Sequence, residues 1–273
     1  MIIFVLITLF LFSIVFVLFF NFAFSASENI FGLLFNRPFY VHFYSRTERL
    51  SVNQRYVLYN QVPFFSSLNP KYKKHFEHRV SKFISKYKFI GKDNFIITDE
   101  VKVLIASTSV MLTFGMRSYL YGIIDVIIVY PSQYYSTINN VYHQGEFNPR
   151  MRAVVFSWEH FRLGIENTTD NLNLGIHEFA HVLNYQSLKS DNASANIFSK
   201  KYYQIQKMIK QKEIIDELIN SDYFRTYAFV NSVEFIAVVL EQFFETPEQF
   251  KELFPELFHK VKQMINYNEK YFR

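Results

Sequence analysis

The sequence predicts an α+β domain that follows an N-terminal hydrophobic helix. Three observations lead to this prediction. Residues 2–24 are apolar and uncharged, since all 29 Lys and Arg and all 24 Asp and Glu lie after them. The strand candidates come early in the remaining chain, and helical patterns occupy its second half. Strands followed by a run of helices are typical of the α+β class.

The composition excludes several kinds of site. The 273 residues include no Cys, which rules out disulfides, thiolate zinc sites, iron–sulfur clusters and a cysteine nucleophile. The seven Gly are too far apart to form the Gly-rich motifs that bind nucleotide phosphates. The formal net charge is +5, but no nucleic-acid-binding motif accompanies it, so we expect no nucleic-acid partner. Any metal must therefore be bound by nitrogen and oxygen ligands.

Residues 2–24 predict a transmembrane anchor, because 20 of these 23 residues are apolar. A helix of this length rises about 34 Å, enough to cross a hydrocarbon core of about 30 Å. A cleaved signal peptide is the alternative, with residues 23–25 as the cleavage site, but its apolar region would be shorter and preceded by basic residues. Basic residues occur only after the segment, beginning at Arg37, so the positive-inside rule predicts a single-pass cell-membrane protein with a cytoplasmic domain.

The expected domain organisation has three parts. Residues 1–26 form the anchor that contacts the lipid bilayer, residues 27–62 a juxtamembrane linker, and residues 63–273 the folded domain. The first clear element of that domain is an amphipathic helix over residues 70–87. Its apolar side chains recur at spacings of three and four, and Pro70 suits the first helical turn.

The first strand candidates alternate with helices. Residues 95–98 predict a short strand, and Thr98 is a candidate N-cap for a helix that runs to about residue 113. Residues 123–130 are mostly β-branched and apolar, which predicts a buried strand that ends before Pro131.

The remaining elements lead into a helical second half. Residues 131–150 predict a polar loop, and residues 153–158 predict another strand. A helix is expected over residues 172–186. Further helices are expected over residues 195–220, 232–244 and 247 to the end.

His177, Glu178 and His181 form an HExxH motif. On a helix, positions i and i+4 share a face, so both imidazoles can bind one zinc ion. Glu178 then lies beside the metal, where a general base is needed. Glu178 is the only charged residue between residues 171 and 187, as expected for a buried active-site helix.

A third metal ligand must come from elsewhere. The metzincin arrangement fails, because Asn184 and Ser187 stand where it requires Gly and His. Residues 233–244 predict a buried helix that carries Glu234 and Glu241 two turns apart. A buried carboxylate is costly unless a metal or a cation accepts it. The residues alone leave open which of the two is the ligand, and either could instead pair with a buried Arg or Lys.

Several separated motifs resemble those of one family. They are Tyr-Pro at 130–131, Gly-Glu-Phe at 145–147, Ser-Trp at 157–158, Asn173, HEFAH at 177–181, Tyr-Ala at 227–228 and EFIAVVLEQFFETP at 234–247. Over residues 63–271 the chain resembles the Mlc titration factor A family of zinc-dependent peptidases. These gluzincin-type enzymes are related in their catalytic domain to anthrax lethal factor. The resemblance implies a zincin-like fold with a small mixed sheet, helices, and HExxH on the active-site helix.

The resemblance also implies roles for individual residues. Glu234 becomes the third ligand of one Zn²⁺ ion beside His177 and His181. Glu241 becomes a residue that supports the ligands or the structure. Glu178 is then the general base, and Tyr227 assists the transition state.

The implied function is a membrane-anchored zinc peptidase that acts on a peptide or protein substrate. The alternative is a regulatory protein that binds and titrates a partner, such as a transcriptional repressor, with proteolysis secondary. One departure from the family pattern lies near the metal. Asn184 replaces the Asp that usually ends the helix motif, which changes an interaction next to the ligands.

Overall fold

A computed structural model describes residues 1–136 and 141–272 of the protein. Its main sheet has the strand order β1-β2-β6-β5. The first three strands run parallel, with Ile127 of β2 opposite Val154 of β6, whereas β5 pairs antiparallel with β6. These strands are β1 (Lys88–Gly91), β2 (Val126–Tyr130), β5 (Gly145–Asn148) and β6 (Ala153–Ser157), while β3 (Tyr134–Ser136) and β4 (Val141–His143) form a separate antiparallel pair.

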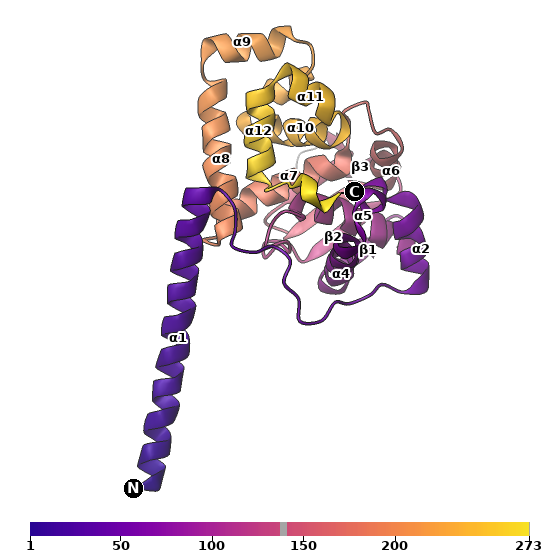
Figure 1. Ribbon diagram of the computed structural model, residues 1–273. Helices are drawn as coiled ribbons and strands as arrows, with labels where there is room; N and C mark the ends of the chain where they lie inside the picture. Colours follow the sequence, from indigo (N-terminus) through magenta and orange to yellow (C-terminus); the bar gives the residue numbers. More distant parts are fainter. Residues whose placement is uncertain (137–140, 273) are drawn as a thin grey trace.

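Helices surround this small sheet, and the structure confirms a mixed helix and sheet fold. The first group comprises α2 (Val52–Gln61), α3 (Pro63–Ser67), α4 (Pro70–Lys86), α5 (Asp99–Thr113), α6 (Trp158–Glu166) and α7 (Leu174–Ser187). The second comprises α8 (Ala193–Ile209), α9 (Lys212–Asn220), η1 (Thr226–Phe229), α10 (Ser232–Glu245), α11 (Pro247–Leu253), α12 (Pro255–Met264) and η2 (Glu269–Tyr271). In Figure 1, helices α8 to α12 gather on one side of α7, and the sheet with α2, α4 and α5 on the other.

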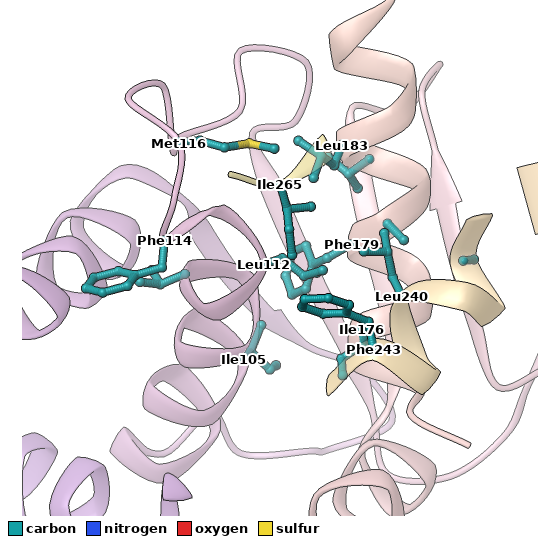
Figure 2. Close-up of a cluster of buried hydrophobic side chains, with 14 of the residues drawn as sticks. Ile105, Leu112, Phe114, Met116, Ile176, Phe179, Leu183, Leu240, Phe243 and Ile265 are labelled. Atoms are coloured by element: carbon teal, nitrogen blue, oxygen red, sulfur yellow. The ribbon is translucent and has the colours of Figure 1, made fainter. Parts of the chain in front are cut away.

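Helix α7 lies at the centre of the core, in contact with α5, α8 and α10. Its Ile176 and Phe179 are buried among side chains from α5 and α10, including Leu112 and Leu240 (Figure 2). Gly175 permits the close approach of α6 to α7, since a Cβ at residue 175 would lie 2.6 Å from Cε2 of Phe161. The most buried helix of the domain is therefore the one that carries HExxH.

The strand prediction for residues 95–98 is wrong. These residues form no strand, and the neighbour of β2 at this edge of the sheet is β1. A tight turn separates the two segments, with the N–H of Phe95 donating to the carbonyl of Lys92 at 2.9 Å. Asp93 and Asn94 adopt left-handed φ values of 50° and 60° in this turn. The turn carries residues 95–98 off the sheet and into the segment that leads to the N-cap of α5.

The predicted loop over residues 131–150 is also wrong, since it contains β3, β4 and β5. These strands are only three or four residues long, and their polar and aromatic residues give no clear alternation. Helix α6 was not predicted either. It begins at Trp158, where the hydroxyl of Ser157 accepts the N–H of His160 and ends strand β6.

Two predicted long helices are each divided. The expected helix over residues 195–220 breaks between α8 and α9 around Lys210, although no Gly or Pro marks the break. The helix expected from Pro247 to the end is interrupted at Pro255. Pro255 cannot donate a helical hydrogen bond, and it disfavours helical geometry in the residue before it.

The first helix, α1 (Ile2–Phe35), extends far beyond the apolar segment and projects from the domain (Figure 1). Residues 2–32 are long and apolar enough to cross a membrane. The end of α1 packs on α8, where a Cβ at Gly32 would lie 3.6 Å from Cδ1 of Ile197, and Glu28 forms an ion pair with Arg117. The range 27–62, expected as a linker, thus includes the end of α1 and also α2, which packs on α5.

Candidate metal centre

Three side chains that the sequence analysis singled out meet at one point. His177 and His181 lie one turn apart on α7, and Glu234 lies in the first turn of α10. Nε2 of His177 is 3.1 Å from Nε2 of His181 and 3.0 Å from Oε2 of Glu234, and the third distance, from Nε2 of His181 to Oε2 of Glu234, is 3.4 Å. A tetrahedral zinc ion with bonds of about 2.0–2.1 Å holds its ligand atoms roughly 3.3 Å apart. The donor set therefore fits one zinc ion.

The hydrogen bonds around His177 define which of its nitrogens faces this point. Nδ1 of His177 lies 2.7 Å from Oε1 of Glu241, so Nδ1 carries the hydrogen that it donates to this carboxylate. Its Nε2 therefore presents a lone pair toward two other atoms with lone pairs, Nε2 of His181 and Oε2 of Glu234. Three such acceptors in close contact require a positive charge between them. A metal ion bound by the three side chains would supply it.

The pKa shifts indicate the same requirement. Burial lowers the pKa of His177, but hydrogen bonds with Glu234 and Glu241 outweigh it and raise the pKa to about 9. Burial raises the pKa of Glu234, yet hydrogen bonds with His177 and His181 bring it well below its usual range. Both shifts express the attraction of the cluster for a cation, because a proton on His177 is the charge available when no metal is bound.

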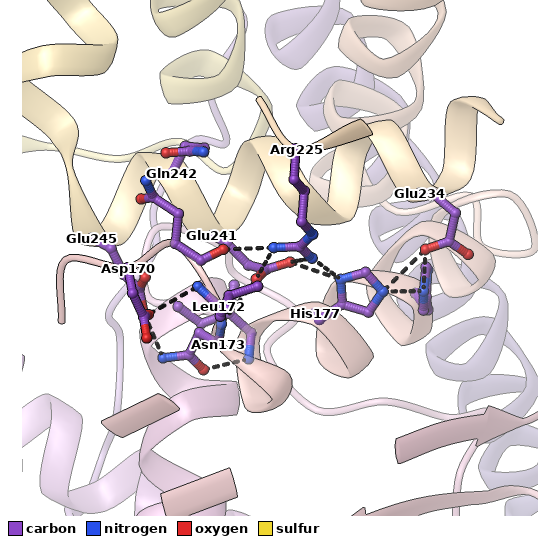
Figure 3. A network of polar contacts seen from close by, with 12 residues as sticks. Asp170, Leu172, Asn173, His177, Arg225, Glu234, Glu241, Gln242 and Glu245 are labelled. Carbon is purple, nitrogen blue, oxygen red and sulfur yellow. Dashed lines mark hydrogen bonds and ion pairs between the residues drawn. The ribbon is translucent and has the colours of Figure 1, made fainter. Parts of the chain in front are cut away.

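Glu241, the second candidate carboxylate, has a different set of partners. It is fully buried and forms a two-pronged ion pair with Arg225, from Nη2 to Oε1 at 2.7 Å and from Nη1 to Oε2 at 2.9 Å. The backbone N–H of Asn173 also donates to its Oε2 at 2.9 Å. Figure 3 shows this network running from Asn173 through Glu241 and Arg225 to His177. The structure thus places Glu234 with the two histidines, while Glu241 is the carboxylate that pairs with a half-buried arginine.

Glu178 lies between the metal cluster and strand β5. Burial raises the pKa of its carboxyl, against the attraction of His177 and His181 and a hydrogen bond from the backbone of Phe147. A raised pKa suits a group that must accept a proton and later release it near neutral pH. Gly145 of β5 leaves the room for it, since a Cβ at residue 145 would lie only 2.9 Å from Oε1 of Glu178.

Tyr227 projects from η1 at the edge of the same site. Its ring centroid is 6.0 Å from that of His177, and 48% of its surface is exposed. Burial of the rest of the side chain, and the nearby Glu234 carboxylate, raise the pKa of Tyr227. The phenol therefore keeps its proton at neutral pH, and can donate a hydrogen bond to a ligand beside the metal cluster.

The comparison with known families identifies the protein group. A family described as glucose-regulated metallo-peptidase M90 matches residues 42–266, a range that contains all three cluster residues. The chain belongs to this M90 metallopeptidase family. The chain is also similar to the uncharacterized protein slr2042 of Synechocystis sp. (strain ATCC 27184 / PCC 6803 / Kazusa). It is 26% identical over 223 residues, which cover 76% of this chain and 81% of that protein.

In this M90 protein, His177 of the cluster lines a cleft of about 600 Å³. The cleft is bounded by His177 and Glu178 on α7, by Gly145 on β5, and by Arg225 and Tyr227 on the opposite side. Its walls thus bring together the HExxH helix α7, the edge strand β5 and the segment around η1. The volume lies within the usual range of about 300–1,000 Å³ for ligand pockets.

Asn184, which departs from the family pattern, is buried on α7 one turn after His181. Neither its Oδ1 nor Nδ1 of His181 has a hydrogen-bond partner within the described ranges. The orientation of His181 therefore lacks the support that Glu241 gives to His177. In this M90 chain, a hydrogen bond to Glu241 orients His177, whereas no described residue bonds Nδ1 of His181.

Arg225 is the functional residue that sequence reasoning missed. An Arg two residues before Tyr227 carries no motif of its own, and the pairing with Glu241 spans 16 residues of chain and the turn around η1. One signal was available. A carboxylate on an apolar helix requires a cationic partner, and Arg225 is the only Arg or Lys between residues 213 and 250.

Proposed function

We propose that this M90 protein is a zinc-dependent peptidase anchored in a membrane. The observation that supports zinc most strongly is the meeting of His177, His181 and Glu234 with mutual distances of 3.0–3.4 Å. Two histidines and one carboxylate are typical ligands of catalytic zinc sites, which keep one position open for water or substrate. Zinc in such a site acts as a Lewis acid and makes water a nucleophile near neutral pH.

Glu178 would transfer the protons, and Tyr227 would stabilise the negative charge that develops in the transition state. Glu178 takes a proton from the attacking water, whose oxygen forms a bond to the carbonyl carbon of the substrate. The same carboxyl then donates the proton to the amide nitrogen as the C–N bond breaks. The phenol of Tyr227 donates a hydrogen bond to the carbonyl oxygen while negative charge develops on it. The products are a carboxylic acid and an amine.

Strand β5 is the proposed position of an extended substrate. It is the terminal strand of the sheet, and its Gly145 and Phe147 lie against Glu178. Addition of a peptide as a further strand would place its backbone beside the general base. Strand β6 cannot take this role, because it lies between β2 and β5 and both of its edges are already paired.

Helix α1 is the proposed anchor, inserted in a cell membrane with the catalytic domain on the cytoplasmic side. The support is its length and apolar composition, together with the Lys and Arg residues that follow it. Because the end of α1 packs on α8, the domain would be held at a fixed orientation to the bilayer. Its substrate would then be a protein or peptide at that surface.

The test uses the full chain in lipid nanodiscs, loaded with one equivalent of zinc and incubated with a broad peptide library. We expect defined cleavage sites, and we expect Glu178→Gln to abolish cleavage while retaining zinc. Equal cleavage by both proteins, or none by either, contradicts the proposal. A partner captured equally by the wild type and by His177→Ala would favour the alternative function of binding a regulatory protein.

A further inference from the structure

Loop 36–50, which leads from α1 toward α2, turns back toward the apolar part of α1. Asn36 ends the helix with a left-handed φ of 50° and so reverses the direction of the chain. The ring centroid of Phe24, in α1, lies 6.2 Å from that of Phe39 and 6.5 Å from that of Tyr40. Figure 1 shows the loop passing below the domain, on the side toward which α1 projects. The chain thus returns along α1 to the level of Phe24.

Phe24 marks the place where α1 would leave the hydrocarbon core of a bilayer. Residues 2–24 carry no charged side chain and form a helix of about 34 Å, whereas the core is about 30 Å thick. The first charged side chain, Glu28, lies one turn further along and pairs with Arg117 of the domain. The guanidinium of Arg117 also lies over the ring of Tyr40, 4.4 Å from its centroid. With α1 across the bilayer, these contacts place the start of loop 36–50 at the depth of the lipid headgroups.

Helix α4 holds the other side of loop 36–50. Nη2 of Arg79 donates to the carbonyl of Val41 at 3.1 Å, and its Nε donates to the hydroxyl of Tyr44 at 2.6 Å. The ring of His42 stacks on an imidazole of α4, with centroids 5.0 Å apart. Phe43 lies between these inward-facing residues and is 78% exposed. The loop therefore presents a large aromatic side chain to its surroundings from a backbone that is fixed to the domain.

The exposed side chains of loop 36–50 are of the kinds that favour the surface of an anionic bilayer. Aromatic residues are enriched at the level of the headgroups, and basic residues near the surface are attracted to anionic lipids. Among the described residues, the three arginines of the loop form no ion pair, whereas its single carboxylate, that of Glu48, is paired with Lys82. The exposed aromatic and basic residues are Arg37, Phe39, Tyr40, Phe43, Arg46 and Arg49.

We propose that loop 36–50 is a second contact with the membrane and binds the anionic surface of the bilayer beside α1. The rings of Phe39, Tyr40 and Phe43 lie among the headgroups, and the arginines bind lipid phosphates. The inference rests on the proposed membrane anchor, and it adds the face of the domain that meets the lipid. Because the end of α1 packs on α8 and the loop is bonded to α4, the two contacts together fix the tilt of the domain.

The test uses single spin labels, which the chain permits because it contains no Cys. Three variants of the full-length protein each carry one label: Phe43→Cys in the loop, Phe12→Cys in α1 and Ile219→Cys in α9. Ile219 is also an exposed apolar residue, and α9 lies at the end of the domain opposite to the free end of α1 (Figure 1). In nanodiscs with equal parts of phosphatidylglycerol and phosphatidylcholine, access of each label to oxygen, which enters lipid, is compared with access to a water-soluble nickel complex.

We expect the ratio of oxygen access to nickel access at position 43 to be roughly threefold higher than at position 219, and lower than at position 12, as for a residue at the interface. Equal ratios at positions 43 and 219, with position 12 in the lipid, overturn this inference and leave the anchor intact. A label at position 12 that is open to the nickel complex overturns the proposed anchor and this inference with it.

Lipid charge tests the arginines. In nanodiscs of phosphatidylcholine alone, the ratio at position 43 should fall about twofold, and Arg46→Gln combined with Arg49→Gln should cause the same fall in the anionic nanodiscs. Lys210→Gln combined with Lys212→Gln removes two exposed charges near α9 and is the matched control. A ratio that responds to neither change contradicts the binding of anionic lipid.

Hydrogen exchange of the unmodified protein decides the question even if a label disturbs the fold. The amides of loop 36–50 should exchange more slowly in the anionic nanodiscs than in the uncharged ones, while those of α9 exchange equally in both. Equal exchange of the loop in the two lipids would contradict the inference.

Discussion

Oε1 of Glu241 lies 2.7 Å from Nδ1 of His177 and holds the imidazole with Nε2 directed at the metal cluster. The same oxygen accepts from Nη2 of Arg225 at 2.7 Å, so the guanidinium compensates the charge of a carboxylate that is otherwise buried. Glu241 would therefore act on a bound metal through His177, whereas Glu234 would bind the metal itself.

Arg225→Lys should weaken zinc binding roughly 10- to 100-fold, as is typical when the partner of a ligating residue is lost. A lysine cannot reproduce the two parallel hydrogen bonds to Glu241, which leaves His177 less well oriented. Zinc affinity is measured by competition with a chromophoric chelator. Arg162→Lys, on an exposed arginine paired with Glu166, is the matched control. An unchanged affinity in Arg225→Lys would show that the ion pair does not support the site.

Tyr227→Phe should lower kcat about 100-fold with little change in zinc content, because a hydrogen bond to the developing oxyanion is lost. KM should change much less, since the phenol donates mainly in the transition state. Steady-state kinetics with a cleaved library peptide provide the measurement. Tyr203→Phe, on an exposed tyrosine of α8, is the control. A kcat equal to that of the wild type would exclude this role for Tyr227.

Gly145→Ala should reduce kcat while zinc remains bound. The new Cβ would lie 2.7 Å from Cδ1 of Leu174 and 2.9 Å from Oε1 of Glu178, so the general base must move. We also expect a loss of stability of about 1–3 kcal/mol from overpacking. Gly122→Ala is the matched control, because the nearest atom to its Cβ lies 4.0 Å away. Similar activities in the two variants would argue against the placement of Glu178.

His42 should make the domain sensitive to acid. Burial, with the nearby Arg79, lowers its pKa from 6.5 to about 2, so the folded state keeps His42 neutral while the unfolded chain protonates it below pH 6.5. The unfolded state then binds more protons, and stability falls by up to about 1.4 kcal/mol per pH unit as the pH decreases below 6.5. Urea unfolding followed by Trp158 fluorescence should show this slope, and His42→Phe should reduce it. Equal slopes would contradict the prediction.

Long elements with strong local signals could be predicted from the sequence. Helix α5 begins at its predicted cap Thr98, and α4 follows the spacing of its apolar side chains. Strand β1, in contrast, is only four residues long and begins with a lysine, so its pairing with β2 decides its structure. Short strands depend on long-range partners that a local pattern does not contain.

The candidate site likewise contains residues that a local pattern predicts and residues that depend on long-range contacts. His177, Glu178 and His181 follow from a motif on one helix, since their spacing sets their geometry. The choice between Glu234 and Glu241 required either the family resemblance or the structure, because both occupy the same face of one buried helix. Arg225 required the structure, since only the fold shows which cation reaches the second carboxylate.

The most direct test of the central claim is the zinc content of the purified full-length protein and two variants, measured by mass spectrometry of the metal after dialysis against zinc-free buffer. We expect one zinc ion per chain in the wild type and almost none in Glu234→Ala. Glu241→Ala should bind zinc more weakly but still take up one ion per chain when zinc is in excess. Zinc retained by Glu234→Ala, together with its complete loss in Glu241→Ala at every zinc concentration, would contradict the assignment of Glu234 as the third ligand.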